Sequence, residues 1–161
     1  MHTRSLFIIA AVAAVTLVAC KGRGTKPADR SVADTIAIIH DKAIVGQWYI
    51  RTVMLNDSLY ARPSEITPGV RQYITFNGDS TVNIKTNCNG MGGRYTMKGD
   101  SLTISDLCWT EMACKNMDVE RLLQRILPEI CTCEIENDSI LRLNAATSGE
   151  YVLLRKAMEK K

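Results

Sequence analysis

The chain has 161 residues, of which 20 are basic and 17 acidic, so its formal net charge is +3. This length corresponds to one domain. Because no basic stripe is interleaved with aromatic residues, the composition argues against nucleic-acid binding. The two histidines are fewer than a catalytic zinc site usually needs, so we expect neither a metal nor another cofactor.

The first segment has the pattern of a bacterial export signal that ends at a cysteine. Arg4 supplies a positive start, and the 13 residues 6–18 carry no charge. This run is shorter than the roughly 20 apolar residues that span a bilayer, but it suits the apolar core of a secretory signal. The sequence Leu17-Val18-Ala19-Cys20 at its end resembles the lipobox of bacterial lipoproteins.

The lipobox resemblance implies that residues 1–19 are a signal peptide and that Cys20 becomes the lipidated first residue. Its sulfur would carry diacylglycerol, and its new amino group an acyl chain such as palmitate. Several acyl chains hold a protein on a membrane almost permanently, so the membrane is the first expected partner. Because Lys21 rather than an Asp follows the cysteine, we expect the outer membrane. The alternative is an ordinary secretory signal with a chance cysteine.

Residues 20–43 are predicted to be a tether, since residues 21–30 are polar, contain Gly and Pro, and lack periodicity. A domain is expected over residues 44–155, followed by a tail at 156–161. Within it, alternation of apolar and polar residues is typical of half-buried strands. About eight short strands are predicted, over residues 47–52, 70–76, 81–86, 94–98, 102–107, 131–135, 140–143 and 151–155.

Turns rich in Asn, Gly, Asp and Ser separate these alternating runs. They occupy residues 56–58, 77–80, 98–101 and 136–139. Asn and Gly tolerate the positive φ of tight hairpins. The sequence therefore predicts a mainly β fold, an antiparallel meander that is closed or nearly closed.

One segment has helical rather than strand periodicity. Apolar residues recur at Val119, Leu122, Leu123, Ile126 and Leu127. This spacing predicts an amphipathic helix over residues 116–127 that covers one end or one face of the sheet. We expect Asn116 or Asp118 to cap its start and Pro128 to end it.

The central block resembles the META domain family of bacterial heat-inducible and envelope lipoproteins. The resemblance is carried by Asn87-Cys88-Asn89-Gly90, by Leu102-Thr103-Ile104 and by Thr110-Glu111-Met112-Ala113-Cys114. It implies a compact β-rich domain with a late helix, a link to heat or envelope stress, and no established catalytic residues. The opening Gly46-Gln47-Trp48 also occurs in lipocalin-like lipoproteins, which have a ligand cavity.

Five cysteines remain besides Cys20, and an odd number leaves at least one thiol. Cys88 and Cys114 lie in the two motif turns, so we predict that they form a disulfide worth about 3 kcal/mol. Cys108 is expected to pair with Cys131 or Cys133.

Three functions are consistent with these patterns. The first is a non-catalytic envelope lipoprotein that contacts an envelope protein or supports the envelope under stress, and we favour it because no catalytic constellation is present. The second is a lipocalin-like binder of a small ligand. The third is a thiol-active or metal-handling protein, since positions i and i+2 of a strand would place Cys131 and Cys133 on one face.

Overall fold

Strand β1 (Gly46–Asn56) organises the sheet because it pairs with three other strands. The computed structural model describes residues 43–157. The predicted signal peptide, Cys20 and most of the tether lie outside these residues. The other strands are β2 (Leu59–Ala61), β3 (Tyr73–Phe76), β4 (Thr81–Lys85), β5 (Gly90–Lys98), β6 (Ser101–Trp109), β7 (Ile130–Glu136), β8 (Ile140–Ala145) and β9 (Tyr151–Lys156).

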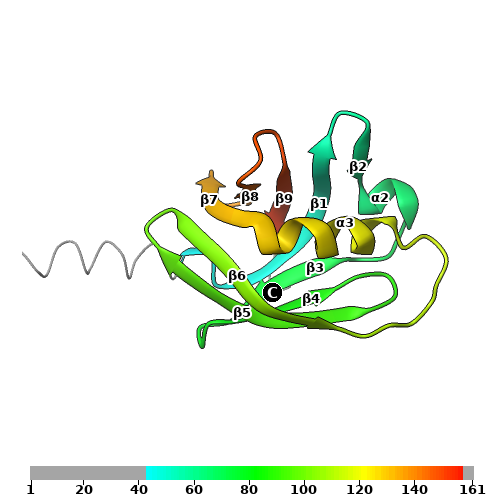
Figure 1. The fold of residues 1–161 in the computed structure, drawn as a ribbon, viewed down its shortest axis with the longest axis horizontal. Coiled ribbons are helices and arrows are strands. Elements are labelled where there is room, and N and C mark those ends of the chain that lie inside the picture. The colour runs from blue at the N-terminus through cyan, green and yellow to red at the C-terminus, as the bar shows by residue number, and fades with distance from the viewer. Residues whose placement is uncertain (1–42, 158–161) are drawn as a thin grey trace, which may run out of the picture.

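The strands form a closed antiparallel barrel (Figure 1). The first half of β1 pairs with β3, its second half with the short β2, and its other edge with β9. The β1–β9 pairing closes a barrel of eight strands, to which β2 is added. This confirms the predicted mainly β, closed meander. The sequence pattern did not predict β2.

The contact between β6 and β7 is the weakest seam in the barrel wall. One residue pair, Ser101 and Thr132, forms its ladder, and the amide of Cys133 donates to the carbonyl of Asp100 at 2.9 Å. The seam is short because the chain leaves β6 and passes through a loop and the helix before it returns as β7.

The predicted helix is present as α3 (Asp118–Ile126), followed by the 3₁₀ turn η1 (Leu127–Glu129). It contacts β1 and β2 (Figure 1). The predicted cap is wrong, because Met117 occupies the N-cap position and no side chain caps the helix. Asn116 has a φ of 60°, and its side-chain amide donates to Ile66 O at 3.4 Å. No helix among the described residues is long and apolar enough to cross a membrane.

Side chains from the barrel and from α3 fill the interior. Trp48 is fully buried, and its indole N–H donates to Ile44 O at 2.7 Å. Phe76 and Tyr95 meet edge to face, with their ring centroids 5.2 Å apart. From α3, the predicted stripe of Val119, Leu122, Leu123 and Ile126 is buried in the same core. This packing leaves the barrel centre to side chains, which disfavours the lipocalin-like alternative.

The predicted hairpin turns join β3 to β4, β5 to β6 and β7 to β8. In the last of these turns Asn137 and Asp138 adopt positive φ, and in the first it is Ser80 that does so. Asp79 accepts from the hydroxyl and amide of Thr81 at 2.6 and 3.0 Å. These bonds hold the pKa of Asp79 below its usual value.

Gly93 lies opposite a bulge in β6, where Asp106 and Leu107 together face it between the Gly92–Cys108 and Arg94–Ser105 pairs. A Cβ on Gly93 would lie 2.8 Å from the carbonyl oxygen of Ser105 and 3.0 Å from the Leu107 side chain. Backbone cannot move aside as a flexible side chain can. A residue with any side chain is therefore excluded unless β6 shifts.

We expect Gly93→Ala to lower the free energy of unfolding by about 1–3 kcal/mol, because it overpacks a closed sheet. Urea denaturation followed by tryptophan fluorescence measures this change. Gly92→Ala is the matched control, since a Cβ there meets its nearest atom at 3.7 Å. If the two variants were equally stable, β6 would be able to shift at the bulge without loss of stability, and the prediction would be wrong.

Candidate functional site

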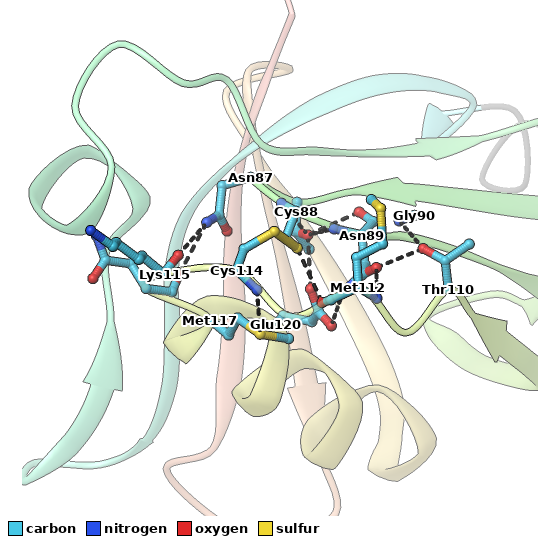
Figure 2. The surroundings of a disulfide bond; sticks show 12 residues. Asn87, Cys88, Asn89, Gly90, Thr110, Met112, Cys114, Lys115, Met117 and Glu120 are labelled. Atoms are coloured by element: carbon cyan, nitrogen blue, oxygen red, sulfur yellow. Dashed lines mark hydrogen bonds between the residues drawn. A yellow bond between two sulfur atoms is a disulfide. The ribbon is translucent and has the colours of Figure 1, made fainter.

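Two loops meet beside the start of α3 and carry the motif residues found in the sequence (Figure 2). One is the connection between β4 and β5, residues 86–89, and the other is residues 110–117 between β6 and α3. A disulfide between Cys88 and Cys114 joins them, with their Cα atoms 6.0 Å apart. The predicted pairing is therefore present.

The side chain of Asn89 links the two loops and the helix. It is fully buried, and its Oδ1 accepts from the Thr110 hydroxyl at 2.7 Å and from the Met112 amide at 2.9 Å. Its Nδ2 donates to Met112 O at 2.9 Å and to the carboxylate of Glu120 at 2.8 Å. Both hydrogens and both lone pairs of the amide are thus used. No other residue type of this size offers the same set of donors and acceptors.

Glu120 is a buried carboxylate that the sequence analysis did not identify. Its exposed fraction is 1 %, and it reaches the loops from the first turn of α3. Besides the Asn89 amide on Oε1, the Thr86 hydroxyl lies 3.1 Å from Oε2. Thr86 Oγ1 in turn accepts from the amides of Cys88 and Asn89 at 3.2 and 2.9 Å. The cluster of Thr86, Asn89 and Glu120 therefore joins the β4–β5 loop to the helix.

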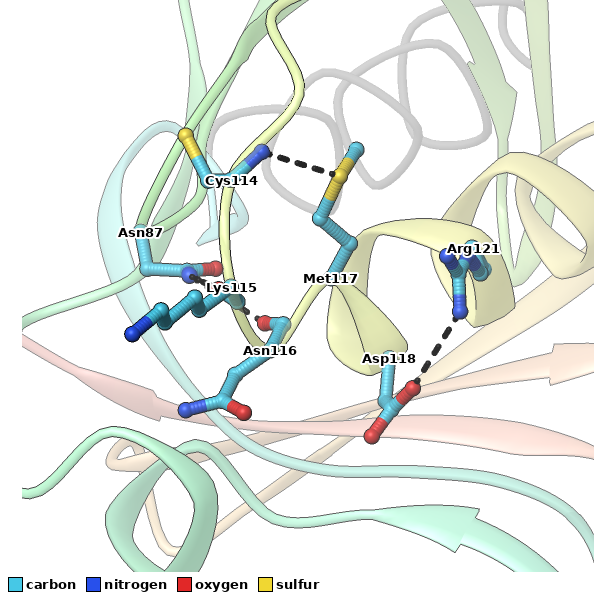
Figure 3. A network of polar contacts seen from close by, with 7 residues as sticks. All are labelled: Asn87, Cys114, Lys115, Asn116, Met117, Asp118 and Arg121. Carbon is cyan, nitrogen blue, oxygen red and sulfur yellow. Dashed lines mark hydrogen bonds and ion pairs between the residues drawn. The ribbon is translucent and has the colours of Figure 1, made fainter.

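The loop before α3 is held by a second set of polar contacts (Figure 3). The Asn87 amide donates to the carbonyls of Lys115 and Asn116 at 3.3 and 3.1 Å. The backbone amide of Cys114 donates to Met117 Sδ at 3.4 Å. These contacts hold the residues that lead into the helix, which begins without a side-chain cap. The Asn116 side chain donates to Ile66 O instead of capping the helix.

The polar atoms of the cluster are occupied by contacts within the domain. The carboxylate oxygens of Glu120 are engaged by protein donors, and their burial keeps them from solvent. The two histidines of the chain, His2 and His40, lie outside the described residues. Among residues 43–157, no group of three or more His, Cys, Asp or Glu side chains could hold a metal ion.

The model of the META domain family matches residues 42–158, which include both motif loops, the disulfide and α3. The chain belongs to the META domain family. The search of curated proteins found no match.

Solved structures support the same fold for this META domain. An NMR structure of a protein from Burkholderia xenovorans aligns over 85 % of this chain and 100 % of its own, with 16 % identity and a TM-score of 0.60. A crystal structure of a "duf4847 family protein" from Bacteroides vulgatus covers 76 % of this chain and 99 % of its own, with 12 % identity and a TM-score of 0.52. At these identities the similarity concerns the fold.

The other cysteines of the META domain are not joined as predicted. Cys108 and Cys131 are exposed thiols, and Cys133 is a buried thiol. The pairing of Cys108 with Cys131 or Cys133 fails because Ser101, not Cys108, lies opposite Thr132. Cys108 is seven residues farther along β6, about 23 Å at the rise of an extended strand.

The expectation that Cys131 and Cys133 share one face is also wrong. The pairing of β7 with β8 shifts between Ile130 and Thr132, so the alternation is interrupted at Cys131. Cys131 consequently faces solvent, while Cys133 faces the core. Two thiols on opposite faces cannot bind one metal ion, which disfavours the thiol-active hypothesis.

Near the disulfide loops, Trp109 and Met112 expose large apolar side chains.

Proposed function

We propose that this chain is a lipid-anchored protein of the cell envelope, in which the META domain acts by binding and not by catalysis. The observation that carries the proposal is Cys20 in the sequence Leu17-Val18-Ala19-Cys20, placed 26 residues before the barrel begins at Gly46. The intervening residues are the proposed tether, which would hold the domain away from the lipid surface. We propose the outer membrane as its location.

The disulfide supports a position outside the cytoplasm. Disulfides persist in oxidising compartments and are rare where cellular thiols keep cysteines reduced. In this domain the Cys88–Cys114 bond fastens the loop that leads into α3. A chain that stayed in the cytoplasm would have to fold without it.

The filled barrel and the engaged carboxylate support a binding role. Catalysis needs a group that can reach a substrate, whereas Glu120 is buried and hydrogen-bonded within the domain. The exposed Trp109 and Met112 support a protein partner, since aromatic residues and Met are enriched at interfaces. From the family resemblance we further propose that the amount of protein rises when cells are heated.

Cys20→Ser tests the anchor. It removes the sulfur that would carry the lipid, so we expect the protein to move from the membrane fraction to the soluble fraction or to persist as an uncleaved precursor without lipid. Fractionation and labelling with a radioactive fatty acid measure both effects. Cys108→Ser, which changes an exposed thiol of the domain, is expected to stay lipidated and membrane-bound. Fatty-acid label on Cys20→Ser would contradict the proposal.

A further inference from the structure

A groove of about 920 Å³ lies on the outer surface of the barrel, beside β1. Its walls come from the outward face of β1, from β9, from the short helix α2 (Pro63–Ile66) and from residues 69–72 before β3. The charged residues that line it are Arg51, Arg62, Glu65, Arg71 and Arg155. Four arginines from distant parts of the chain therefore share one surface.

The strand pairing places the groove on the outer face of the barrel. Trp48 and Ile50 of β1 face the core, so the intervening Tyr49 points outward. Arg155 lies opposite Tyr49 in the β1–β9 pairing, which places that arginine on the same outer face. Arg51 lies where the register of this pairing shifts, and it is exposed. A partner can therefore reach the groove without any opening of the barrel.

The groove concentrates positive charge. The whole chain has 20 basic and 17 acidic side chains, whereas the groove has four arginines against the single carboxylate of Glu65. That carboxylate is paired with Arg62 at 3.0 Å. Within the described part of the chain, Arg51, Arg71 and Arg155 take part in no ion pair. Because guanidinium groups bind phosphate oxygens in bidentate geometry, three uncompensated arginines favour an anionic partner.

One of these arginines is positioned by an aromatic ring. Arg71 donates from Nη1 to the Tyr49 hydroxyl at 3.2 Å, and its guanidinium carbon lies 5.4 Å from the centre of that ring. Both contacts restrict the side chain before a partner arrives, which reduces the entropy lost on binding. A guanidinium has five N–H donors, so the bond to the hydroxyl leaves most of them for another acceptor.

Exposed apolar side chains adjoin the arginines. Val70 lines the groove and is 47 % exposed. Tyr60 of β2 is 44 % exposed, and the guanidinium carbon of Arg62 lies 5.1 Å from the centre of its ring. Basic residues combined with exposed aliphatic and aromatic side chains suit the boundary between lipid headgroups and acyl chains. A free phosphate ion would contact the arginines but would leave these apolar side chains in water.

We propose that the groove binds the phosphate headgroups of an anionic membrane. This inference rests on the proposed lipid anchor, which would keep the domain beside a bilayer and raise the effective concentration of headgroups at the groove. On a neutral bilayer the tether leaves the domain off the surface, whereas anionic lipid draws the groove onto it. Each basic side chain near such a surface strengthens binding about fivefold, so the three unpaired arginines together give a factor of about one hundred.

Modification of arginines by phenylglyoxal tests the proposal on the full lipidated chain, added to preformed vesicles. One set of vesicles contains phosphatidylcholine alone, and the other contains phosphatidylcholine with phosphatidylglycerol. We expect Arg51, Arg71 and Arg155 to react about threefold or more slowly on the anionic vesicles, as measured by mass spectrometry of peptides. Arg94 and Arg125, which are exposed and lie outside the groove, should react at the same rate on both.

Two pairs of substitutions separate the groove from the general charge of the domain. In the protein with Arg51→Ala and Arg155→Ala, Arg71 should react equally fast on both kinds of vesicle. In the protein with Arg94→Ala and Arg125→Ala, which lacks the same charge elsewhere, the protection of Arg71 should persist. Loss of this protection in both proteins would overturn the proposal, as would equal protection of Arg94 and Arg125 in the wild-type protein.

A soluble phosphate ester distinguishes a lipid headgroup from a free ligand. Glycerol phosphate added with the neutral vesicles, at the same phosphate concentration, should leave the reactivity of Arg71 unchanged. Protection by glycerol phosphate would overturn the proposal in favour of a soluble ligand. Equal reactivity of the groove arginines on both kinds of vesicle would overturn it in favour of an acidic protein.

Flotation of the protein with the vesicles reports the proposed anchor separately. A lipidated chain floats with both kinds of vesicle, whereas a chain without an anchor would float with the anionic vesicles only. Failure of the anchor therefore changes flotation with the neutral vesicles, and failure of the groove changes the protection of its arginines.

Discussion

Replacing Cys88 and Cys114 together by alanine is expected to lower the free energy of unfolding by about 3–4 kcal/mol. The bond closes a loop across 26 positions, and the chain-entropy model assigns a stabilisation of this size to such a loop. In addition, it ties the residues before α3 to the β4–β5 loop. Guanidinium denaturation of the oxidised wild-type and variant proteins measures the difference, with tryptophan fluorescence and circular dichroism as independent probes.

The remaining thiols provide the matched control for this experiment. Cys108→Ala and Cys131→Ala change exposed cysteines that form no disulfide, so together they should alter stability by less than about 0.5 kcal/mol. A reductant should destabilise the wild-type protein but not the variant without Cys88 and Cys114. If the reductant destabilised both proteins equally, the disulfide would not be the source of the effect.

Asn89→Ala is expected to be the most damaging single substitution in the site, at about 3 kcal/mol or more. It removes the Asn89 amide that donates to Oε1 of the buried Glu120 carboxylate, and it leaves both polar atoms of the Met112 backbone without their bonds to Asn89. Losing one donor to a buried carboxylate is costly because the oxygen that it served stays buried without that bond. Equilibrium denaturation measures the loss.

Two further variants separate hydrogen bonding from packing at this position. Asn89→Asp keeps the shape but replaces the donating amide by an acceptor that faces the Glu120 carboxylate, so it should destabilise the domain as well. Asn83→Ala, at an exposed position on β4, should change stability little. A stable Asn89→Asp protein would mean that the cluster tolerates two facing carboxyl groups.

Local patterns in the sequence predicted much of the barrel. Alternation identified the strands because each buries one face, and the helical stripe identified α3 because the same side chains enter the core. The turn residues at 136–139 were informative because Asn137 and Asp138 must adopt positive φ. The disulfide was predictable because Cys88 and Cys114 lie in the two motif turns, 26 positions apart, with a hairpin between them.

The predictions that were wrong, and the residue that was missed, depend on strand register and on contacts between segments far apart in the sequence. The bulge at Cys131 reverses the face of one cysteine, and no periodicity in the sequence marks it. The prediction that Asn116 caps the helix was wrong because its side-chain amide donates to the carbonyl of Ile66, 50 positions away. Glu120 was missed because a carboxylate beside an apolar stripe normally faces solvent. Its place next to Val119 and three positions before Leu123 is the signal that was available.

Intact-mass spectrometry of the protein purified from membranes tests the account most directly, because one spectrum reports the anchor and the disulfide. We predict a chain that begins at Cys20, carries a diacylglyceryl group and an added acyl chain, and is two hydrogens lighter than its fully reduced form. Fragmentation should place that loss at Cys88 and Cys114. A mature chain with an unmodified Cys20, or with both of these cysteines reduced, would contradict the account.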